Sequence, residues 1–168
     1  SSAALKDFVG RHGGVVCTSS NARGVLEWAF ERAGGRGAVL FFPDQHLGRN
    51  TGLKMGLEED RMPVWIPAMG ASSGLDDARI VLWHGFCSVH KRFTAEQISD
   101  FRTRYPEGVV VVHPECPRAT VEAADADGST EYIKRFINAQ PPGSSIAVGT
   151  EINMVARMAK EHPDKHIE

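Results

Sequence analysis

The run Gly108-Val109-Val110-Val111-Val112-His113-Pro114-Glu115-Cys116 is the most apolar stretch of the chain, and it passes directly into polar residues. Four consecutive β-branched residues favour a strand, and a strand that is apolar at every position is typical of a parallel sheet covered by helices on both faces. Ligands of such sheets gather at the carboxyl ends of the strands. The run therefore predicts an α/β fold with His113 and Glu115 at a candidate site.

The same pattern extends in both directions along the chain. Strand-sized apolar runs alternate with segments that have apolar residues at three- and four-residue spacing, as in successive βαβ units. We predict the fold class α/β, with three-layer αβα modules and parallel sheets. The predicted strands are Gly14–Thr18, Ala38–Phe42, Arg79–Trp83, Val109–His113 and Ser145–Val148. The predicted helices are Ala3–Arg11, Asn21–Ala33, Thr94–Tyr105, Thr130–Ala139 and Glu151–Glu161.

Two further stretches bear on the organisation of the chain. Met62–Asp77 contains two prolines and a run of small turn residues, which predicts a long loop or insertion. Residues 14–47 and 124–154 share an order of strand, hydroxyl residues, helix, glycine, strand and acid. This weak internal echo predicts two similar α/β modules, which we place at residues 1–90 and 91–168.

The bulk composition is that of an ordinary globular chain. The 168 residues are 42% hydrophobic and 24% charged, with a net charge of −2, which argues against nucleic acid as the main partner. No apolar run reaches the length of a membrane span. The three cysteines, an odd number with no Cys-x-x-Cys pair, do not suggest a disulfide framework. We therefore expect a cytoplasmic protein without a membrane partner.

Hydroxyl residues precede two of the predicted helices. Ser19 or Ser20 and Ser129 or Thr130 lie where a helix begins. Taken singly, each is best explained as an N-cap, whose side-chain oxygen accepts from a free backbone N–H. The free N–H groups and the helix dipole also make such a position an anion site. Two anion sites on one chain would suit a substrate with several negative charges.

The segment His84-Gly85-Phe86-Cys87-Ser88-Val89-His90 is the most distinctive of the chain, because two histidines flank a thiol. Cys87 has three readings: a small buried residue, a nucleophilic thiolate activated by His84 or His90, or a ligand of a soft metal. These residues alone do not choose among them. Cys17 and Cys116 are expected to be non-catalytic.

Three classes of function are compatible with these patterns. The first is an enzyme in which Glu115 and His113 transfer protons, since a proline between them fixes the turn. The second is a thiol- or metal-dependent α/β enzyme that uses Cys87, His90 and Glu115. The third is a small-anion-binding module that uses only the hydroxyl-rich helix starts.

Six segments, in this order, resemble those of the quinolinate synthases. They are Val16-Cys17-Thr18-Ser19-Ser20-Asn21-Ala22, Pro43-Asp44-Gln45-His46-Leu47-Gly48, Trp83-His84-Gly85-Phe86-Cys87-Ser88-Val89-His90, Val112-His113-Pro114-Glu115-Cys116-Pro117, Gly128-Ser129-Thr130 and Gly149-Thr150-Glu151-Ile152-Asn153-Met154. The resemblance spans essentially the whole chain. It implies two of the three pseudo-repeated αβα domains of that family, the second without its start and the third without its end.

The resemblance also implies an activity. Quinolinate synthases condense iminoaspartate with dihydroxyacetone phosphate in the biosynthesis of NAD, with L-aspartate oxidase as the upstream supplier. A [4Fe-4S] cluster, held by one cysteine from each domain, acts there as a Lewis acid through an iron that has no protein ligand.

By position, the resemblance assigns roles to seven residues. Cys87 matches a cluster ligand, Glu115 the acid/base carboxylate and His113 a histidine that holds the substrate. His90 is expected to support the site. Substrate-binding hydroxyl groups are matched by Ser19, Ser129 and Thr130. The other two cluster ligands would lie outside residues 1–168, so we expect this piece to lack the cluster and to be inactive alone.

Overall fold

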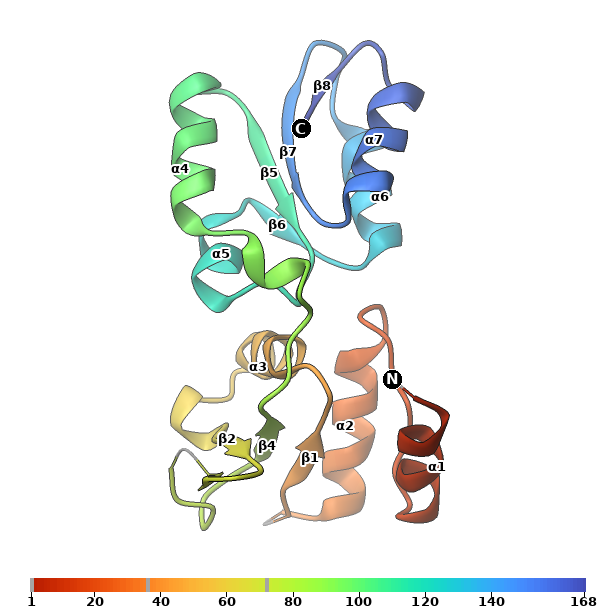
Figure 1. Ribbon diagram of the computed structural model, residues 1–168, viewed down its shortest axis with the longest axis vertical. Helices are drawn as coiled ribbons and strands as arrows, with labels where there is room; N and C mark the ends of the chain where they lie inside the picture. The colour runs from red at the N-terminus through yellow and green to blue at the C-terminus, as the bar shows by residue number, and fades with distance from the viewer. Residues whose placement is uncertain (1, 36, 72) are drawn as a thin grey trace. The chain divides into compact units, whose positions relative to one another are not determined.

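A computed structural model describes residues 2–35, 37–71 and 73–168 (Figure 1). The chain divides into two compact units, Ser1–Gly85 and Phe86–Glu168, each with its own sheet. The α/β fold class is therefore confirmed, and five of the six strand pairings in the two sheets are parallel. The domain boundaries of the family, predicted at residues 90 and 91, stay a prediction.

The second unit is an open parallel sheet with the order β6-β5-β7-β8. Its strands are β5 (Val109–Val112), β6 (Ala126–Asp127), β7 (Ser145–Gly149) and β8 (His166–Ile167). Its helices are α4 (Ala95–Arg104), α5 (Arg118–Ala123), α6 (Thr130–Ala139) and α7 (Ile152–Glu161), with a 3-10 turn, η2, at His90–Arg92. Figure 1 shows α4 and α5 on one side of the sheet and α6 and α7 on the other.

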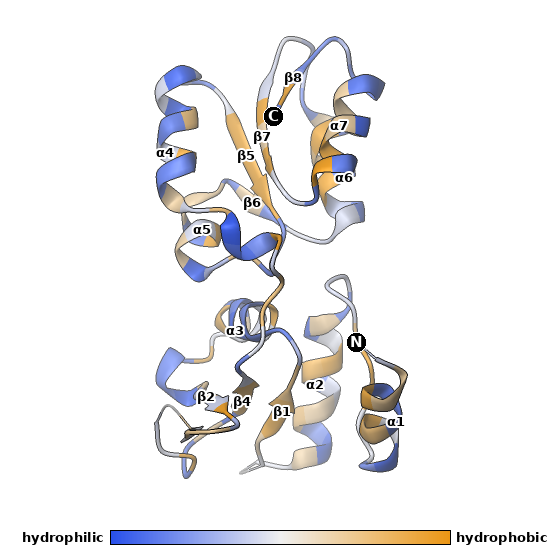
Figure 2. Ribbon diagram, in the orientation of Figure 1, coloured by the Kyte–Doolittle hydropathy of each residue, from blue (hydrophilic) through white to orange (hydrophobic). Residues whose placement is uncertain are grey.

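Alternate residues of β5 face two separate cores. Val111 lies in the core formed with α6 and α7, which contribute Ile133, Ile137 and Met158. Val110 and Val112 pack on the opposite face, against α4 and α5. Because both faces are buried, this two-residue period explains why the strand is apolar at every position. Figure 2 shows β5 coloured as hydrophobic. The second unit is thus a three-layer αβα arrangement.

The first unit contains a mixed sheet with the order β1-β4-β2-β3. Its strands are β1 (Val39–Phe41), β2 (Val64–Ile66), β3 (Gly70–Ala71) and β4 (Ile80–Trp83). Its helices are α1 (Ala3–Arg11), α2 (Ala22–Ala33) and α3 (Gln45–Lys54), with a 3-10 turn, η1, at Glu59–Arg61. β1, β4 and β2 are parallel, and only β3 runs antiparallel to its neighbour β2. Leu26, Phe41, Ile80 and Leu82 form its core.

The predicted strand Gly14–Thr18 is wrong. No residue of this segment lies in a strand, and Val15 and Val16 are about half exposed. The Gly14 N–H donates to the carbonyl of Val9 (2.9 Å), and the Thr18 N–H donates to the side chain of Asn21 (2.8 Å). In a strand, backbone N–H groups donate to a neighbouring strand. Two N–H groups of this segment instead donate to residues close in sequence.

The predicted loop Met62–Asp77 is also partly wrong, because it contains β2 and β3; one residue of the range, 72, lies outside the described residues. The prolines that suggested a loop, Pro63 and Pro67, lie just outside the bounds of β2. A proline at a strand end removes no hydrogen bond from the interior of the ladder. The remaining predicted helices and strands are present, with ends shifted by no more than a residue or so.

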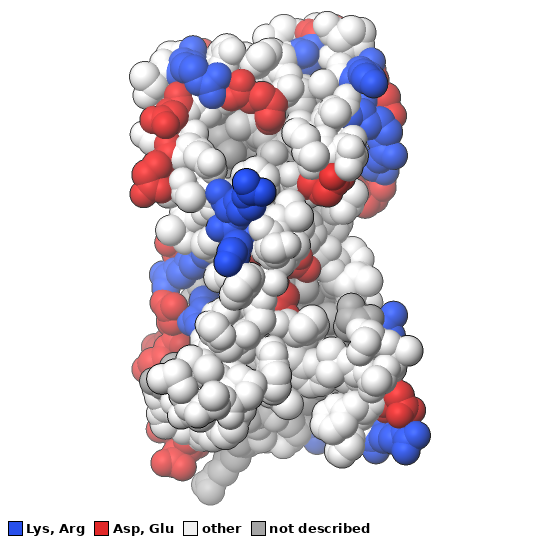
Figure 3. Space-filling view, viewed as in Figure 1, with Lys and Arg blue, Asp and Glu red and all other residues white. Residues whose placement is uncertain are grey.

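In the described part of the chain, no helix is long and apolar enough to cross a bilayer. Acidic and basic side chains are interspersed on the face shown in Figure 3.

Candidate functional site

The carboxyl ends of three neighbouring strands of the second unit carry the candidate site. Strand register places Asp127, Val112 and Gly149 in one row across β6, β5 and β7. The next residue along each strand is Gly128, His113 or Thr150. His113 continues the ladder, because its N–H donates to the Gly149 carbonyl (3.0 Å). The polar segments after the three strands therefore leave the sheet side by side.

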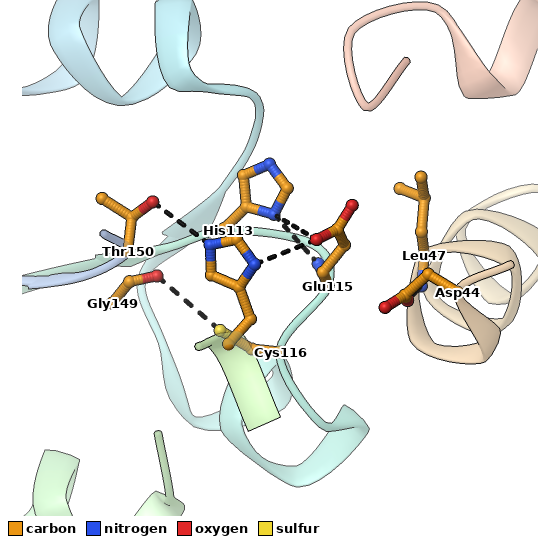
Figure 4. Close-up of polar contacts among 8 residues, drawn as sticks. Asp44, Leu47, His113, Glu115, Cys116, Gly149 and Thr150 are labelled. Atoms are coloured by element: carbon orange, nitrogen blue, oxygen red, sulfur yellow. Dashed lines mark hydrogen bonds and ion pairs between the residues drawn. The ribbon is translucent and has the colours of Figure 1, made fainter. Parts of the chain in front are cut away.

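A tight turn after β5 brings the side chains of His113 and Glu115 together. The Cys116 N–H donates to the His113 carbonyl (2.9 Å), which closes the turn. The Glu115 N–H lies 3.3 Å from His113 Nδ1, and Glu115 Oε2 lies 3.9 Å from the same nitrogen. Figure 4 shows the imidazole and the carboxylate on the same side of this turn.

His90 bridges two of the strand ends. Its Nδ1 lies 3.0 Å from Glu115 Oε2, and its Nε2 lies 3.3 Å from Thr150 Oγ1. Its ring stacks on that of His113, with 4.2 Å between centroids and 12° between planes. His90 and Thr150 are both buried. His90 thus connects the carboxylate after β5 with the hydroxyl group after β7.

His113 is a neutral imidazole at neutral pH. Burial lowers its pKa to about 4, assisted by the nearby His90, while Glu115 and Asp127 act in the opposite direction. Since Nδ1 accepts the backbone N–H of Glu115, the single ring proton is on Nε2. His113 can therefore donate a hydrogen bond through Nε2 without carrying a charge.

Glu115 is an ionised carboxylate at neutral pH. The hydrogen bond from His90 is the largest cause that lowers its pKa, and burial opposes it. His113 and a hydrogen bond from the Cys87 side chain lower the pKa further. A half-buried carboxylate with these partners can accept a proton from a bound substrate.

The described residues contain one group of three potential metal ligands of different types. Single donor atoms of Cys87, His90 and Glu115 all lie within 4.8 Å of one another. Thiolate, imidazole and carboxylate together suit a transition metal better than magnesium or calcium. This arrangement leaves open whether Cys87 is a nucleophile or a ligand, but it removes the reading of an isolated buried cysteine.

Cys116 has a different environment, although it lies next to Glu115 in sequence. It is fully buried, and its Sγ lies 3.7 Å from the Gly149 carbonyl (Figure 4). Burial raises the pKa of its thiol to about 12. A thiol that stays protonated at neutral pH is neither a good nucleophile nor a good ligand, which agrees with its expected non-catalytic role.

The hydroxyl residues after β6 form a helix start in the same unit. Ser129 is the N-cap of α6, and its Oγ accepts the N–H of Tyr132 (3.3 Å). Thr130 is the first residue of α6 and is exposed. The capping reading of Ser129 is therefore correct, and Thr130 is the hydroxyl group that remains accessible for an anion.

Ser19 belongs to the first unit, and its role in binding substrate stays a prediction. It lies in the turn before α2, where Thr18 Oγ1 and Ser20 Oγ are 2.8 Å apart. Asp44 and Glu151 are helix caps. Asp44 Oδ1 accepts the Leu47 N–H (2.8 Å, Figure 4), and Glu151 accepts the N–H groups of Asn153 and Met154.

Thr150 is a site residue to which the sequence assigned no role. A threonine after a strand is common, and its hydroxyl group usually satisfies a nearby backbone group. The available signal was its place in the row of strand ends beside His113. What identifies it is the combination of burial and contact with His90.

Comparisons with known proteins agree on one family. The family model described as Quinolinate synthetase A protein matches residues 1–168. The quinolinate synthase of Corynebacterium glutamicum is 60% identical over 171 residues, which cover 99% of this chain and 43% of that protein. The quinolinate synthase of Rhodopirellula baltica is 52% identical, with 99% and 43% covered. That of Bacillus subtilis is 49% identical, with 100% and 46% covered. The chain thus spans less than half the length of these relatives.

Proposed function

Because this chain belongs to the quinolinate synthetase A family, we propose that the protein of which it is a part is a quinolinate synthase. That enzyme condenses iminoaspartate with dihydroxyacetone phosphate to give quinolinate, with loss of phosphate and water, for the biosynthesis of NAD. The observation that supports the proposal is the convergence of Cys87, His90, His113 and Glu115 at the strand ends of the second unit.

The donor set fits one ligand of a [4Fe-4S] cluster. Cys87 is the thiol beside the carboxylate, whereas Cys116 is held protonated by burial and Cys17 belongs to the first unit. Cys87 would therefore hold one iron, and two further thiolates would come from parts of the protein outside residues 1–168. When bound, the cluster supplies a Lewis acid that polarises an oxygen of the substrate. With one thiolate of three, residues 1–168 alone should not hold it and should be inactive.

Glu115 and His113 are the groups that move and hold protons in this proposal. The ionised Glu115 can take a proton from carbon or nitrogen of the bound substrates and return it to a departing hydroxyl group. The neutral His113 donates through Nε2 and so orients a carboxylate or carbonyl oxygen. His90 positions Glu115 through their hydrogen bond.

The substrates carry several negative charges, and hydroxyl-rich helix starts are suited to them. Thr130 and the free N–H groups of the first turn of α6 would bind one anionic group, next to Ser129. Ser19 would bind another from the start of α2. Iminoaspartate is an oxidised amino acid, so its supplier must be an amino-acid-oxidising enzyme; we assign this role to L-aspartate oxidase, in the cytoplasm.

The test uses the whole protein, assayed without oxygen for quinolinate formation and for cluster absorbance. Replacing Glu115 by Gln should lower the rate by roughly 10²- to 10⁴-fold and leave the absorbance in place. Glu122→Gln, on the exposed surface of α5, is the matched control and should behave as wild type. A wild-type protein that forms no quinolinate would disprove the function, and a Glu115→Gln variant at near-normal rate would remove Glu115 from the mechanism.

A further inference from the structure

Cys87, His90 and Glu115 come close enough together to bind a single metal ion without any cluster. Their donor atoms lie within 4.8 Å of one another, and His90 Nδ1 and Glu115 Oε2 are 3.0 Å apart. Two nitrogen or oxygen ligands of a tetrahedral zinc ion are separated by about 3.4 Å. The side chains need to move by only about 1 Å to share one ion. We propose that these three residues form a site for one thiophilic divalent cation, of which zinc is the best fit, and that this ion competes with the cluster for Cys87.

The hydrogen bonds around Glu115 have the form that such a site takes without its ion. The carboxylate accepts from two neighbours, the His90 ring and the Cys87 thiol. A cation replaces both hydrogens, since the thiol releases its proton and His90 keeps one proton on Nε2. That Nε2 lies 3.3 Å from the hydroxyl group of the buried Thr150, which can accept it. Histidine ligands of metals are usually oriented by such a second hydrogen bond.

The choice of ion follows from the donor types. Magnesium and calcium bind oxygen ligands, so one carboxylate with a thiolate and an imidazole suits neither. Zinc accepts sulfur, nitrogen and oxygen in one tetrahedral site, and three protein ligands leave its fourth position to water. The neighbouring His113 is not in the set, because its Nδ1 accepts the Glu115 N–H. Cys116 is not in the set either, because its thiol stays protonated.

Binding of the ion concerns the cluster-free protein and does not rest on the proposed function, whereas the competition for Cys87 does. The two use Cys87 in alternative ways, so an ion bound there would block delivery of a cluster. Cobalt(II) is a suitable probe for zinc, because a thiolate ligand gives it an intense charge-transfer absorbance. The test therefore measures metal binding by the 168-residue chain directly, without any assay of quinolinate formation.

The reduced, metal-free chain is titrated with cobalt(II) and then with zinc. We expect one equivalent of cobalt to produce the thiolate band and one equivalent of zinc to remove it. Cys87→Ser should abolish the band, and His90→Gln and Glu115→Gln should each weaken binding by at least about tenfold. Thr150→Val should weaken binding by roughly tenfold, as loss of an orienting partner does. Circular dichroism checks that each variant is folded.

Two matched cysteine variants complete the test. Cys17→Ser, in the first unit, and Cys116→Ala, at the buried thiol, should keep the band and the affinity of wild type. The proposal is overturned if cobalt gives no thiolate band, if the band survives in Cys87→Ser, or if His90→Gln binds as tightly as wild type. A failure here leaves the proposed function intact, because that function is tested on the cluster-loaded whole protein.

Discussion

Several neighbours lower the pKa of Glu115, and His90 has the largest effect among them. The hydrogen bond from His90 is the largest cause that lowers its pKa, and it outweighs the opposing effect of burial. In the metal-free chain, His90→Phe keeps an aromatic ring against His113 but removes the hydrogen bond. We expect the pKa of Glu115 to rise, as burial becomes the largest remaining influence. Carbon-13 NMR of the glutamate carboxyl groups measures this directly.

The control for this variant is His12→Phe, which changes an exposed histidine of α1's C-cap in the first unit. Its Glu115 signal should titrate as in wild type. If the pKa of Glu115 in His90→Phe stayed at the wild-type value, the hydrogen bond from His90 would not be the main cause that lowers it.

His113 makes the stability of the chain depend on pH. Its pKa is about 4 in the folded chain, below its ordinary value of 6.5, so between these values the unfolded chain binds more protons. Stability conferred by the neutral ring is fully present above about pH 6.5 and is lost as the pH falls towards 4. We expect wild type to lose up to about 3 kcal/mol over this window. Urea unfolding at several pH values measures the loss.

His113→Gln keeps a neutral polar side chain and removes the titration. Its stability at neutral pH should be lower than that of wild type, because the stacked ring is lost, but its decline on acidification should be shallower. An equally steep decline in the variant would assign the acid sensitivity to other groups.

Most residues of the candidate site could be predicted from the chain alone, for a physical reason. Parallel strands end at one edge of a sheet, so polar residues that follow apolar runs are brought together whatever the details of the loops. This rule placed His113 and Glu115 at the candidate site, and it put Thr150 at a strand end without giving it a role. It does not give side-chain contacts, so the stack of His90 on His113 and the bridge to Thr150 required the structure.

At the scale of elements, α3 and α5 are absent from the predicted helix ranges, and α3 shows the reason. Its buried face is built largely from small and polar residues, including Gly48, Thr51 and Gly52, so it lacks the large apolar periodicity of an ordinary amphipathic helix. The glycines allow a close approach to the sheet. A Cβ added at Gly48 would lie 2.6 Å from a methyl group of Leu82 and 2.7 Å from the ring of Phe41.

A pair of glycine-to-alanine variants tests this packing. Gly48→Ala forces a methyl group into the core of the first unit, and we expect it to destabilise the chain by roughly 1 to 3 kcal/mol. Gly24→Ala is the matched control, since Gly24 also lies inside a helix, α2, but a Cβ there would meet nothing within 4 Å. It should be stabilising by up to about 1 kcal/mol, because alanine favours the helix. Urea unfolding of both variants gives the comparison, and equal effects would contradict the packing argument.

The segment Gly14–Thr18 shows the opposite error at this scale. Its composition, with two adjacent valines, is that of a strand, but a strand also needs a partner for its backbone. Among the described residues, β1 pairs only with β4. The N–H groups of Gly14 and Thr18 donate to Val9 and Asn21, which are close in sequence. Local composition therefore indicated a strand, but it could not show whether a partner strand was present.

At the scale of the whole molecule, the chain consists of two units with separate cores. The core of Phe41, Ile80 and Leu82 belongs to Ser1–Gly85, and those around Val111 and Val112 belong to Phe86–Glu168. The alternation of strands and helices predicted the fold class of both units. It did not distinguish the sheet that is covered on both faces from the one in which Leu40 and Trp83 are 49% and 38% exposed.

The second unit should fold without the first. Phe86–Glu168 has a parallel sheet with helices on both faces, and two of the three core clusters lie within it. A piece of this size can bury enough apolar surface to be stable by itself, although marginally. We expect residues 86–168 to unfold in one cooperative transition on addition of urea, with a core substitution such as Ile137→Ala lowering its stability by about 2 to 5 kcal/mol.

The same piece carries Cys87, His90, Glu115 and Thr150, so it should bind cobalt(II) with the affinity of the 168-residue chain. Its control is the piece with Cys87→Ser, which should fold alike and show no thiolate band. A cooperative piece that binds at least about tenfold more weakly than the longer chain would mean that the first unit contributes to the site. A piece with no cooperative transition would show that the second unit depends on the first for its fold.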